Sequence, residues 1–522
     1  MFTKLSNVKK EALKWNKLVL GRLDNDIKKK LAELQEIQDS IDSLEAVRKE
    51  KTMREELEVL LNSEETMWTQ KARSNWILNG DRNTRYFQTV VRQRRARSKI
   101  LHIKDEEGLL LEDPLENENR LVTHFKSPYK DTALLSVDSI LSELQSFDIP
   151  KLSHQQCLDM SRPVTSWEIE DTIFQLGPHK ASGPDGIPAF FFVNSIGRLS
   201  KSMLSTPFEP FSHSGSLFKP LNHTFLTVIP KTPFPDEVIH FRPISLFNVI
   251  YKTISKILVN RLKPFMDSLI SPFQNAFKKG RSISNNILIA HEIMDILRKK
   301  KGRNGSFGAL KIYMKKAYDR VSWNFLRAVL TAKNFSQQWI NWLMECVTSI
   351  QYTLLVNGSR SKSFKPCKGL RQGDPLSPYL FLMCVNVLSL SLQKAKYDEL
   401  INGVKVGRNG CTFTHLLFAD DSLFFFKKDN KSVANLKRIL DWYCKISRQD
   451  INFGKSDLYC SPNMPLFEQE DLARQLHVNL VQHPSKYLGI NFKLRGNRVA
   501  DFQFLVDKLQ SKLEGWKANL LS

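Results

Sequence analysis

Two adjacent aspartates, Asp420 and Asp421, are the strongest candidates for chemistry in this sequence. They stand between two apolar, aromatic-rich runs, residues 416–418 and 423–426, a pattern typical of a strand, a tight turn and a second strand. Neighbouring carboxylates at the end of a hydrophobic hairpin repel each other and resist loss of solvent. A divalent cation such as Mg²⁺ removes that conflict, because it binds carboxylate oxygens at sites it shares with substrate phosphates. For an isolated Asp-Asp pair an ordinary exposed turn is the alternative, so the rest of the chain must decide.

Two basic residues flank a second predicted hairpin. Residues 226–231 and 241–246 have the composition of strands and are joined by a proline-rich turn. Lys231 and Arg242 lie at its two sides, where a point charge and a bidentate fork can clamp a triphosphate. Basic residues near hairpins are common, so this pair alone is a weak signal.

A glycine precedes a helix that we expect to be buried. Ser377 is a good N-cap and Pro378 suits the first helical position. Residues 379–385 are apolar all round, which predicts burial. Gly373, just before this helix, allows another group to approach the backbone closely.

A dense basic stretch lies between residues 68 and 100. Its aromatic residues are Trp68, Trp76, Tyr86 and Phe87, and its arginines include Arg73, Arg82, Arg85, Arg92, Arg94 and Arg95. Basic side chains interleaved with aromatic ones suit a nucleic-acid backbone and its bases. A solvated basic helix face is the alternative, but the excess of cations favours a nucleic-acid interface.

The composition of the whole chain agrees with a polyanionic partner. Its 522 residues include 77 Lys and Arg against 54 Asp and Glu, a formal net charge of +23. Nucleic acid is the first partner to expect and an anionic membrane surface the second. No apolar run reaches the length of a transmembrane helix, and no signal-peptide pattern opens the chain. The seven scattered cysteines show no zinc-site spacing, so we expect an intracellular protein of the nucleus or cytoplasm, not a secreted one.

Apolar residues recur every three or four positions between residues 23 and 47, with charged residues between them. This spacing predicts an amphipathic helix and allows a short coiled coil. Self-association is one reading, and packing on the chain's own body is the favoured one.

The order of four segments resembles the reverse transcriptase of plant non-LTR retrotransposons (long interspersed elements). The segments are residues 241–245 (FRPIS), 316–321 (KAYDRV), 369–378 (GLRQGDPLSP) and 418–421 (FADD). The resemblance implies an α+β, right-hand polymerase fold, with fingers, an antiparallel palm sheet and a preceding helical extension. On this basis residues 1–62 form a coiled-coil-like helical segment and 63–178 a basic helical extension. Residues 179–495 form the fingers and palm, and 496–522 begin a truncated thumb helix.

The same resemblance assigns roles and partners. RNA template, DNA primer and deoxynucleoside triphosphates would be the partners, and two Mg²⁺ ions the cofactors, with no membrane involved. Tyr318 would pack under the sugar of the nucleotide, and Lys455 would assist departure of pyrophosphate. The remaining implied sites are phosphate binding by Lys231 and Arg242, shaping of the nucleotide and template pocket by Gln372 and Gly373, metal binding by Asp420 and Asp421, and a grip on the primer end by Tyr487, Leu488 and Gly489.

One position departs from this pattern where chemistry is most sensitive. The family has an Asp four residues before the Ala-Tyr pair, and this sequence has Tyr313 there. A phenol has a reference pKa of about 10, so it is neutral at pH 7 and a poor ligand for Mg²⁺. Residues 308–313 are a predicted strand, and Asp319 lies beyond it on the following turn or helix, so it is a weak substitute. Losing a carboxylate that bridges two metals should slow nucleotide transfer roughly a thousandfold or more.

Other departures point to a decayed copy. Arg448 replaces a family Gly, and Pro207 and Pro210 interrupt a family helix. We also expect the family's endonuclease and most of its thumb to be absent. We therefore expect a polymerase module that is intact in fold and severely impaired in activity. The alternatives are a non-catalytic nucleic-acid-binding scaffold and a pseudogene product without function.

Overall fold

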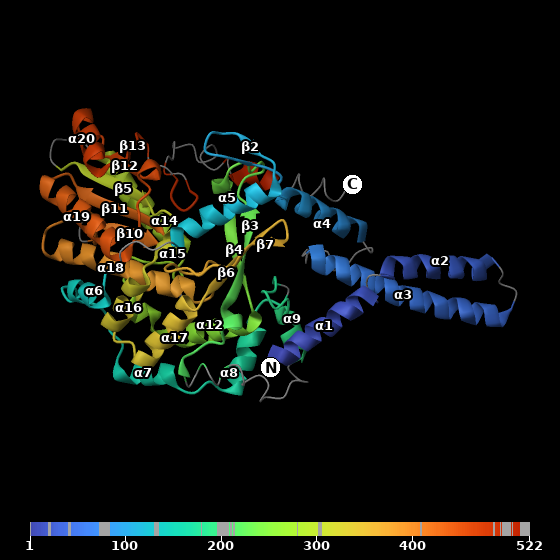
Figure 1. Ribbon diagram of the computed structural model, residues 1–522. Helices are drawn as coiled ribbons and strands as arrows, with labels where there is room; N and C mark the ends of the chain where they lie inside the picture. Colours follow the sequence, from blue (N-terminus) through green and yellow to red (C-terminus); the bar gives the residue numbers. More distant parts are fainter. Residues whose placement is uncertain are drawn as a thin grey trace.

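The computed structural model describes residues 2–18, 22–39, 43–72, 84–129, 135–178, 180–195, 208, 211, 214–278, 280–300, 305–407, 410–483, 486–490, 492, 503 and 505–511. Two β-sheets and the helices packed around them form the body of the molecule, and a pair of long helices projects from it (Figure 1).

The projecting pair is α2 (Leu23–Asp39) and α3 (Leu44–Ala72), between α1 (Phe2–Leu18) and α4 (Thr84–Ser98). The two helices run antiparallel, with Leu23, Ile27 and Leu34 buried against Leu57. The apolar repeat from residue 23 to 47 thus forms two helices and not one, and its buried residues pack within the chain. This finding agrees with the favoured reading of the repeat.

Residues 103–195 form a series of shorter elements on the body of the molecule. They are β1 (Ile103–Lys104), β2 (Leu110–Leu111), α5 (Pro114–Lys126), η2 (Ser127–Tyr129), α6 (Val137–Leu144), α7 (His154–Ser161), α8 (Ser166–Phe174) and α9 (Ala189–Ser195). Local sequence explains where α5 begins. Asp113 accepts a hydrogen bond from the backbone N–H of Glu116 at 3.0 Å, and Pro114 occupies the first turn, where its missing N–H costs nothing.

The first large sheet has the strand order β4-β3-β6-β7. Its strands are β3 (His223–Pro230), β4 (Phe241–Phe247), β6 (Gln351–Val356) and β7 (Ser359–Arg360), with η3 (Lys219–Asn222) before β3 and η4 (Val238–His240) before β4. Strands β3 and β4 pair antiparallel with Ile229 opposite Arg242, so the predicted hairpin is confirmed. Strand β6 joins β3 in parallel.

The second sheet has the order β10-β11-β5-β12-β13. Its strands are β5 (Phe307–Tyr313), β10 (His415–Phe418), β11 (Asp421–Lys427), β12 (Asp457–Cys460) and β13 (Asn479–Leu480), and all pairs but β12–β13 are antiparallel. Alternation along the strands buries both faces. Leu310 and Ile312 belong to the main core, whereas Ala309, Leu423 and Phe425 pack in a second cluster on the other face.

Helices supply most of the main core around this sheet. They are α12 (Val249–Leu262), η5 (Lys263–Phe265), α13 (Met266–Leu269), α14 (Ile283–Lys299), α15 (Ala317–Arg320), α16 (Trp323–Ala332), α17 (Gln337–Thr348), α18 (Ser377–Tyr397), α19 (Asn430–Ser447) and α20 (Leu466–Leu476), with η6 (Phe453–Lys455) and the small hairpin β8 (Val404–Lys405) and β9 (Thr412–Phe413). Helix α18 is buried over residues 380–385, as its apolar sequence predicts. It begins one residue earlier than predicted, with Leu376 and not Ser377 at the cap position.

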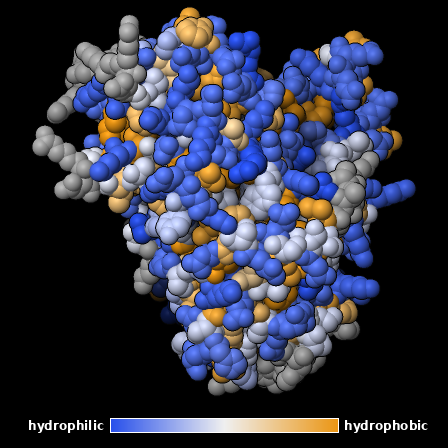
Figure 2. Space-filling model, turned by 90° about the vertical axis from the view of Figure 1, so that its left-hand side faces the viewer, coloured by the Kyte–Doolittle hydropathy of each residue, from blue (hydrophilic) through white to orange (hydrophobic). Residues whose placement is uncertain are grey.

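The predicted α+β fold with a helical N-terminal extension is confirmed. The finer division at residues 62, 178 and 495 stays a prediction, and α3 runs across residue 62. On the face seen in Figure 2, hydrophilic residues cover most of the surface and hydrophobic ones form small separate groups. No described helix combines the length and apolar character needed to cross a membrane.

Candidate nucleotide and metal site

The turn between β10 and β11 presents Asp420 and Asp421 at the end of the second sheet. A buried glutamine, Gln274, holds this turn, because its Oε1 accepts a hydrogen bond from the N–H of Ala419 at 3.1 Å. Ala419 itself has a left-handed backbone with φ +53°. Asn286, also fully buried, donates to the carbonyl of Leu417 at 3.0 Å. The turn is therefore fixed by two interior amides to which sequence reasoning gave no role.

The pKa of Asp421 is shifted in the direction expected from the repulsion between the two neighbouring carboxylates. Burial raises the pKa of Asp421, and the neighbouring Asp420 carboxylate raises it further, while Lys311 opposes the shift. Asp420 is exposed and Asp421 is half-buried. Two carboxylates that disfavour each other's charge suit a cation between them.

Tyr313 lies directly opposite Asp421 on the adjacent strand β5. Residues paired in this way present their side chains on the same face of the sheet. The backbone of Tyr313 is fixed on its other side: its N–H donates to Ser456 Oγ at 3.2 Å, and its carbonyl accepts from Asn452 at 2.7 Å. The Lys311 ammonium lies 4.6 Å from the centre of the Tyr313 ring. The phenol therefore occupies the strand position nearest to Asp421.

Two other carboxylates near β5 are engaged elsewhere or displaced. Asp319 Oδ1 accepts a hydrogen bond from the Tyr129 hydroxyl at 3.0 Å, so it faces η2. Asp457 lies opposite Lys311, two residues along β5 from Tyr313, which is roughly 7 Å along the strand. Neither takes the strand position of Tyr313.

Tyr318 and the loop of residues 369–374 meet beside Asp420. The Tyr318 ring stacks on Phe381 with centroids 4.6 Å apart. Burial raises the pKa of Tyr318, and the Asp420 carboxylate adds to this effect. The loop is tied to the same residue, because Leu370 N–H donates to the Tyr318 carbonyl at 2.7 Å.

Gln372 and Gly373 form the exposed part of this loop. Gly373 has φ +93° and open space around the position of a Cβ, so its glycine is required by backbone conformation. The residues on either side are buried: Arg371 packs 4.2 Å from the centre of the Tyr251 ring, and Asp374 accepts from the Tyr251 hydroxyl at 2.6 Å. Sequence reasoning missed this network, which anchors the loop.

The basic residues of the first hairpin lie near one another and near the second sheet. Burial lowers the pKa of Lys231, and the charges of Arg242 and of Lys455 on η6 lower it further. Lys231 Nζ also donates to the Ile239 carbonyl at 2.7 Å. The three cations therefore lie near enough for Arg242 and Lys455 to act on the pKa of Lys231, and their binding of phosphates stays a prediction.

Tyr487, Leu488 and Gly489 form a tight turn close to Asp421. Tyr487 and Ile490 exchange backbone hydrogen bonds of 2.9 and 3.0 Å, and Leu488 and Gly489 both have positive φ. Tyr487 is buried, and the Asp421 carboxylate contributes to raising its pKa. The turn predicted to grip the primer thus adjoins the aspartate pair.

Only some of the arginines predicted to bind nucleic acid lie among the residues that the structure describes. Arg92, Arg94 and Arg95 are exposed on α4, and Arg94 donates to the Ala72 carbonyl at 2.9 Å. Arg73 and Arg82 lie outside the described residues, as do Pro207 and Pro210, and the side chain of Arg85 is not described. The aromatic part of the prediction is wrong for Phe87, because this ring is buried between α3 and α4 and offers no face to a base.

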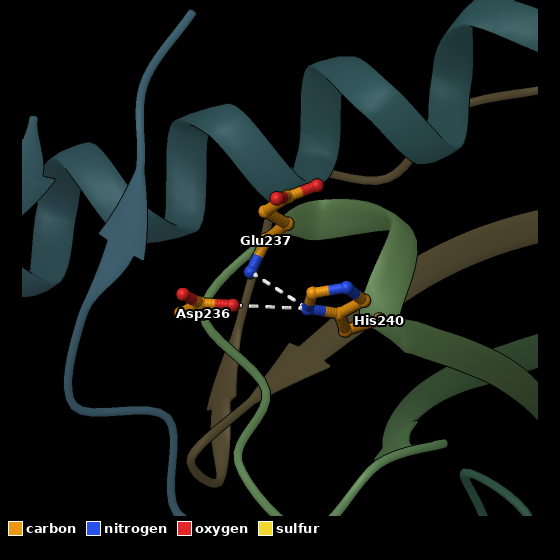
Figure 3. Close-up of side chains that lie close together, drawn as sticks. All are labelled: Asp236, Glu237 and His240. Carbon is orange, nitrogen blue, oxygen red and sulfur yellow. Dashed lines mark hydrogen bonds and ion pairs between the residues drawn. The ribbon is translucent and has the colours of Figure 1, made fainter. Parts of the chain in front are cut away.

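A second group of possible metal ligands lies between β3 and β4. Asp236, Glu237 and His240 offer ligand atoms within 4.8 Å of one another (Figure 3). Asp236 is already bound to Lys104 Nζ at 2.6 Å, and His240 Nδ1 lies 3.3 Å from the backbone N of Glu237, which donates to it. These contacts close the turn before β4, which accounts for the group without a metal.

An acidic hairpin in a largely antiparallel sheet and a basic hairpin in a second sheet are the elements expected of the palm and fingers of a polymerase. Residues 229–492, just over half of the chain, match the family model for reverse transcriptase (RNA-dependent DNA polymerase). The chain belongs to the reverse transcriptase family. Proteins of mobile elements are among its relatives.

Two of these relatives cover much of the chain. The transposon TX1 uncharacterized 149 kDa protein of Xenopus laevis is 24% identical over 390 residues, 74% of this chain and 28% of that protein. The retrovirus-related Pol polyprotein from the type-1 retrotransposable element R2 of Nasonia vitripennis is 27% identical over 278 residues, 53% of this chain and 25% of that protein. An uncharacterized mitochondrial protein of Arabidopsis thaliana is 46% identical over 68 residues, 13% of this chain and 56% of that protein. The chain thus spans between a quarter and a third of the length of the first two.

Proposed function

We propose that this chain is the RNA-directed DNA polymerase module of a plant non-LTR retrotransposon, and that Tyr313 leaves it severely impaired in nucleotide transfer. The observation that carries the proposal is the pairing of Tyr313 with Asp421 across β5 and β11. The 46% identity to an Arabidopsis protein supports the plant origin.

The surroundings of the aspartate pair suit the substrates of such an enzyme. Lys231, Arg242 and Lys455 would bind the phosphates of a deoxynucleoside triphosphate, since their mutual repulsion is relieved by an anion. Tyr318, stacked on Phe381 beside Asp420, would lie under the sugar and exclude a 2′-hydroxyl. Gln372 and Gly373 would contact the nucleotide and the RNA template. The turn at residues 487–489 would hold the end of the DNA primer against Asp421.

The set of metal ligands is incomplete for a two-metal reaction. A pair of Mg²⁺ ions would activate the primer 3′-hydroxyl and neutralise the departing pyrophosphate. Asp420 and Asp421 fit this role, because each offers carboxylate oxygens where negative charge is crowded. Tyr313 does not fit, because a neutral phenol supplies no charge to bridge two ions. The chain therefore holds the substrates but lacks one anionic ligand for the ions.

A basic cleft favours a second candidate, a scaffold that binds nucleic acid without catalysis. The cleft has a volume of about 540 Å³, with Lys180, Lys252 and Lys256 among its lining residues and Gly373 at its border. Burial lowers the pKa values of Lys252 and Lys256, and the charge of Lys180 lowers both further. Phe247 and other apolar residues form a wall beside these cations. Such a cleft suits a single strand, with phosphates on the lysines and a base on the wall.

Primer extension on an RNA template separates these candidates. We would compare the unmodified chain with Tyr313→Asp at equal concentration, first in Mg²⁺ and then in Mn²⁺. Extension by Tyr313→Asp alone supports the proposal. Extension by the unmodified chain refutes the impairment. If neither protein extends the primer but both bind it with a strong salt dependence, the scaffold replaces the enzyme.

A further inference from the structure

A group of basic side chains gathers around His124 of α5, in a segment to which the sequence gave no chemistry. His124 Nε2 lies 3.1 Å from the Nζ of Lys316, the residue that precedes α15. Lys316 holds a left-handed backbone with φ +47°, which is uncommon for a residue with a side chain. Its ammonium is thus brought against α5 at the cost of local strain.

The protonation of His124 follows from this contact. A lysine ammonium only donates hydrogen bonds, so Nε2 must accept and the ring proton stays on Nδ1. Burial lowers the pKa of His124 to about 4, and Lys316, Lys231 and Arg120 lower it in that order of importance. A neutral histidine therefore stands among three cations from α5, the fingers hairpin and the start of α15.

The nearby acids offset these charges only in part: burial lowers the pKa of Lys316, and the Asp319 carboxylate opposes this shift. Asp319 accepts from the Tyr129 hydroxyl at 3.0 Å, and Asp450 is shared by Lys315 at 3.4 Å and Arg320 at 3.3 Å. Arg120 Nε is buried and has no hydrogen-bond partner among the described residues. A guanidinium donor without a partner inside a cationic group is the arrangement expected where an anion binds.

The group shares Lys231 with the proposed triphosphate site, because the charges of Arg242 and Lys455 also lower the pKa of Lys231. A chain of phosphates carries several charges in a row, so it can reach cations on the fingers, the palm and α5 together. We propose that Arg120 and His124 of α5 extend the phosphate site and bind the distal end of a polyphosphate chain, with His124 positioning Lys316. Helix α5 lies outside residues 229–492, which match the family model. The inference rests on the proposed function for the location of the triphosphate.

Binding of inorganic tripolyphosphate to the full chain tests this inference without catalysis. Calorimetry at constant ionic strength would compare the unmodified chain with Arg120→Gln and Lys126→Gln. Lys126 is the matched control, because it is exposed on the same helix about 200° around the axis from His124. We expect Arg120→Gln to weaken tripolyphosphate binding about tenfold, by loss of a charge-assisted hydrogen bond, and Lys126→Gln to leave it unchanged.

The variant His124→Glu distinguishes a role of His124 in phosphate binding from a purely structural role. An acid at this position relieves the repulsion among Lys231, Lys316 and Arg120, so we expect a higher Tm together with weaker tripolyphosphate binding. A residue that only supports the fold would give a lower Tm instead, and that result overturns the inference. Equal affinities for the unmodified chain and Arg120→Gln, or equal losses in Arg120→Gln and Lys126→Gln, overturn it as well.

Further titrations identify the source of the phosphates. A deoxynucleoside triphosphate whose binding weakens in Arg120→Gln, beside a monophosphate whose binding does not, assigns the site to the incoming nucleotide. Weakening confined to pyrophosphate assigns it to the product. Both results retain the polyphosphate site. If Tyr313→Asp does not extend a primer but Arg120→Gln still weakens polyphosphate binding, the proposed activity is contradicted and the polyphosphate site is not.

Discussion

Two regions of the aspartate turn differ: the buried amides that hold its backbone, which we call the framework, and the positions expected to bind metal ions. Behind the turn, Gln274 and Asn286 fix the backbone of residues 417–419 from inside the protein. In front of it, one of the three positions expected to hold metal ions carries the phenol of Tyr313. The hydrogen bonds behind the turn are complete, whereas on the proposed function the set of metal ligands is not.

On the proposed function, this site would have lost its chemistry without losing its shape. Tyr313 is half-exposed at the end of β5, where its side chain is not needed for the core. A substitution there costs little folding free energy, whereas a change at a buried hydrogen-bonded group costs much more. Catalytic and structural residues of the same site should therefore respond differently to mutation.

The largest effect should follow from removing a second ligand after the first is restored. In a Tyr313→Asp protein, Asp421→Asn should slow incorporation of a single nucleotide on the order of a thousandfold, since two ions again lack a bridging carboxylate. Single-turnover kinetics would measure this. Asp457→Asn is the matched control, because that acid lies two residues along from the site, and its rate should not change. An equal loss in Asp457→Asn would place the metals elsewhere.

The protein should lose stability when one charge of the buried Arg371–Asp374 pair is removed. Asp374→Asn leaves the Arg371 guanidinium, which lies 3.9 Å from Asp374 Oδ2, buried without a counter-ion. We expect a loss of about 3 kcal/mol in the free energy of unfolding, measured by urea denaturation. Asp398→Asn, at the exposed residue that follows α18, should change it by less than about 0.5 kcal/mol. Equal effects at both positions would contradict a buried network.

A buried amine elsewhere in the protein should make stability depend on pH. Lys333 is fully buried, and burial lowers its pKa to about 7 from its ordinary 10.5. Between these values the unfolded chain binds more protons, so this residue makes stability rise with pH from 7 to 10.5 and penalises it most below 7. Lys333→Met should stabilise the protein by about 2 kcal/mol at pH 6.5.

The gain from Lys333→Met should shrink by about 1.4 kcal/mol for each pH unit above 7. The carbonyl of Leu269, which accepts from Lys333 Nζ, keeps a second donor in Asn386 at 3.3 Å. Urea denaturation at pH 6.5 and 8.5 measures both effects. A gain that does not vary with pH would mean that Lys333 stays charged in the folded protein.

The smallest effect concerns the end of α19. Arg448 has φ +63° at the C-cap, a left-handed conformation that favours glycine. Arg448→Gly should therefore raise the free energy of unfolding by about 0.5–1 kcal/mol. Ala434→Gly, at an exposed position inside the same helix, should lower it by about 1 kcal/mol. A loss in both variants would show that Arg448 makes a stabilising contact.

Local patterns in the sequence predicted the strands that carry the site. Apolar runs around Asp420 and Asp421 predicted β10 and β11, and residues 308–313 were predicted as the strand that became β5. The resemblance to a family then marked Tyr313 as a position of the site. Alternation with period two is a local property, so one sequence is enough to read it. Sequence patterns did not predict contacts between residues that lie far apart in the chain.

Distant partners explain what sequence reasoning missed. Arginine is seldom buried, so nothing local marks Arg371 as part of the interior. Gln274 meets Ala419 across 145 residues, and His124 meets Lys316 across 192. Phe87 looked available for base stacking because its neighbours are basic, but tertiary packing buries it. Such contacts follow from the fold and not from spacing.

The most direct test of the account is single-turnover incorporation of one deoxynucleotide on an RNA template with a bound DNA primer. Three proteins would be compared: the unmodified chain, Tyr313→Asp and Tyr313→Asn. We expect rapid incorporation by Tyr313→Asp only, because Asn removes the bulk of the ring without supplying a charge for the metals. Incorporation by the unmodified chain at the rate of Tyr313→Asp would contradict the claim that Tyr313 silences the site.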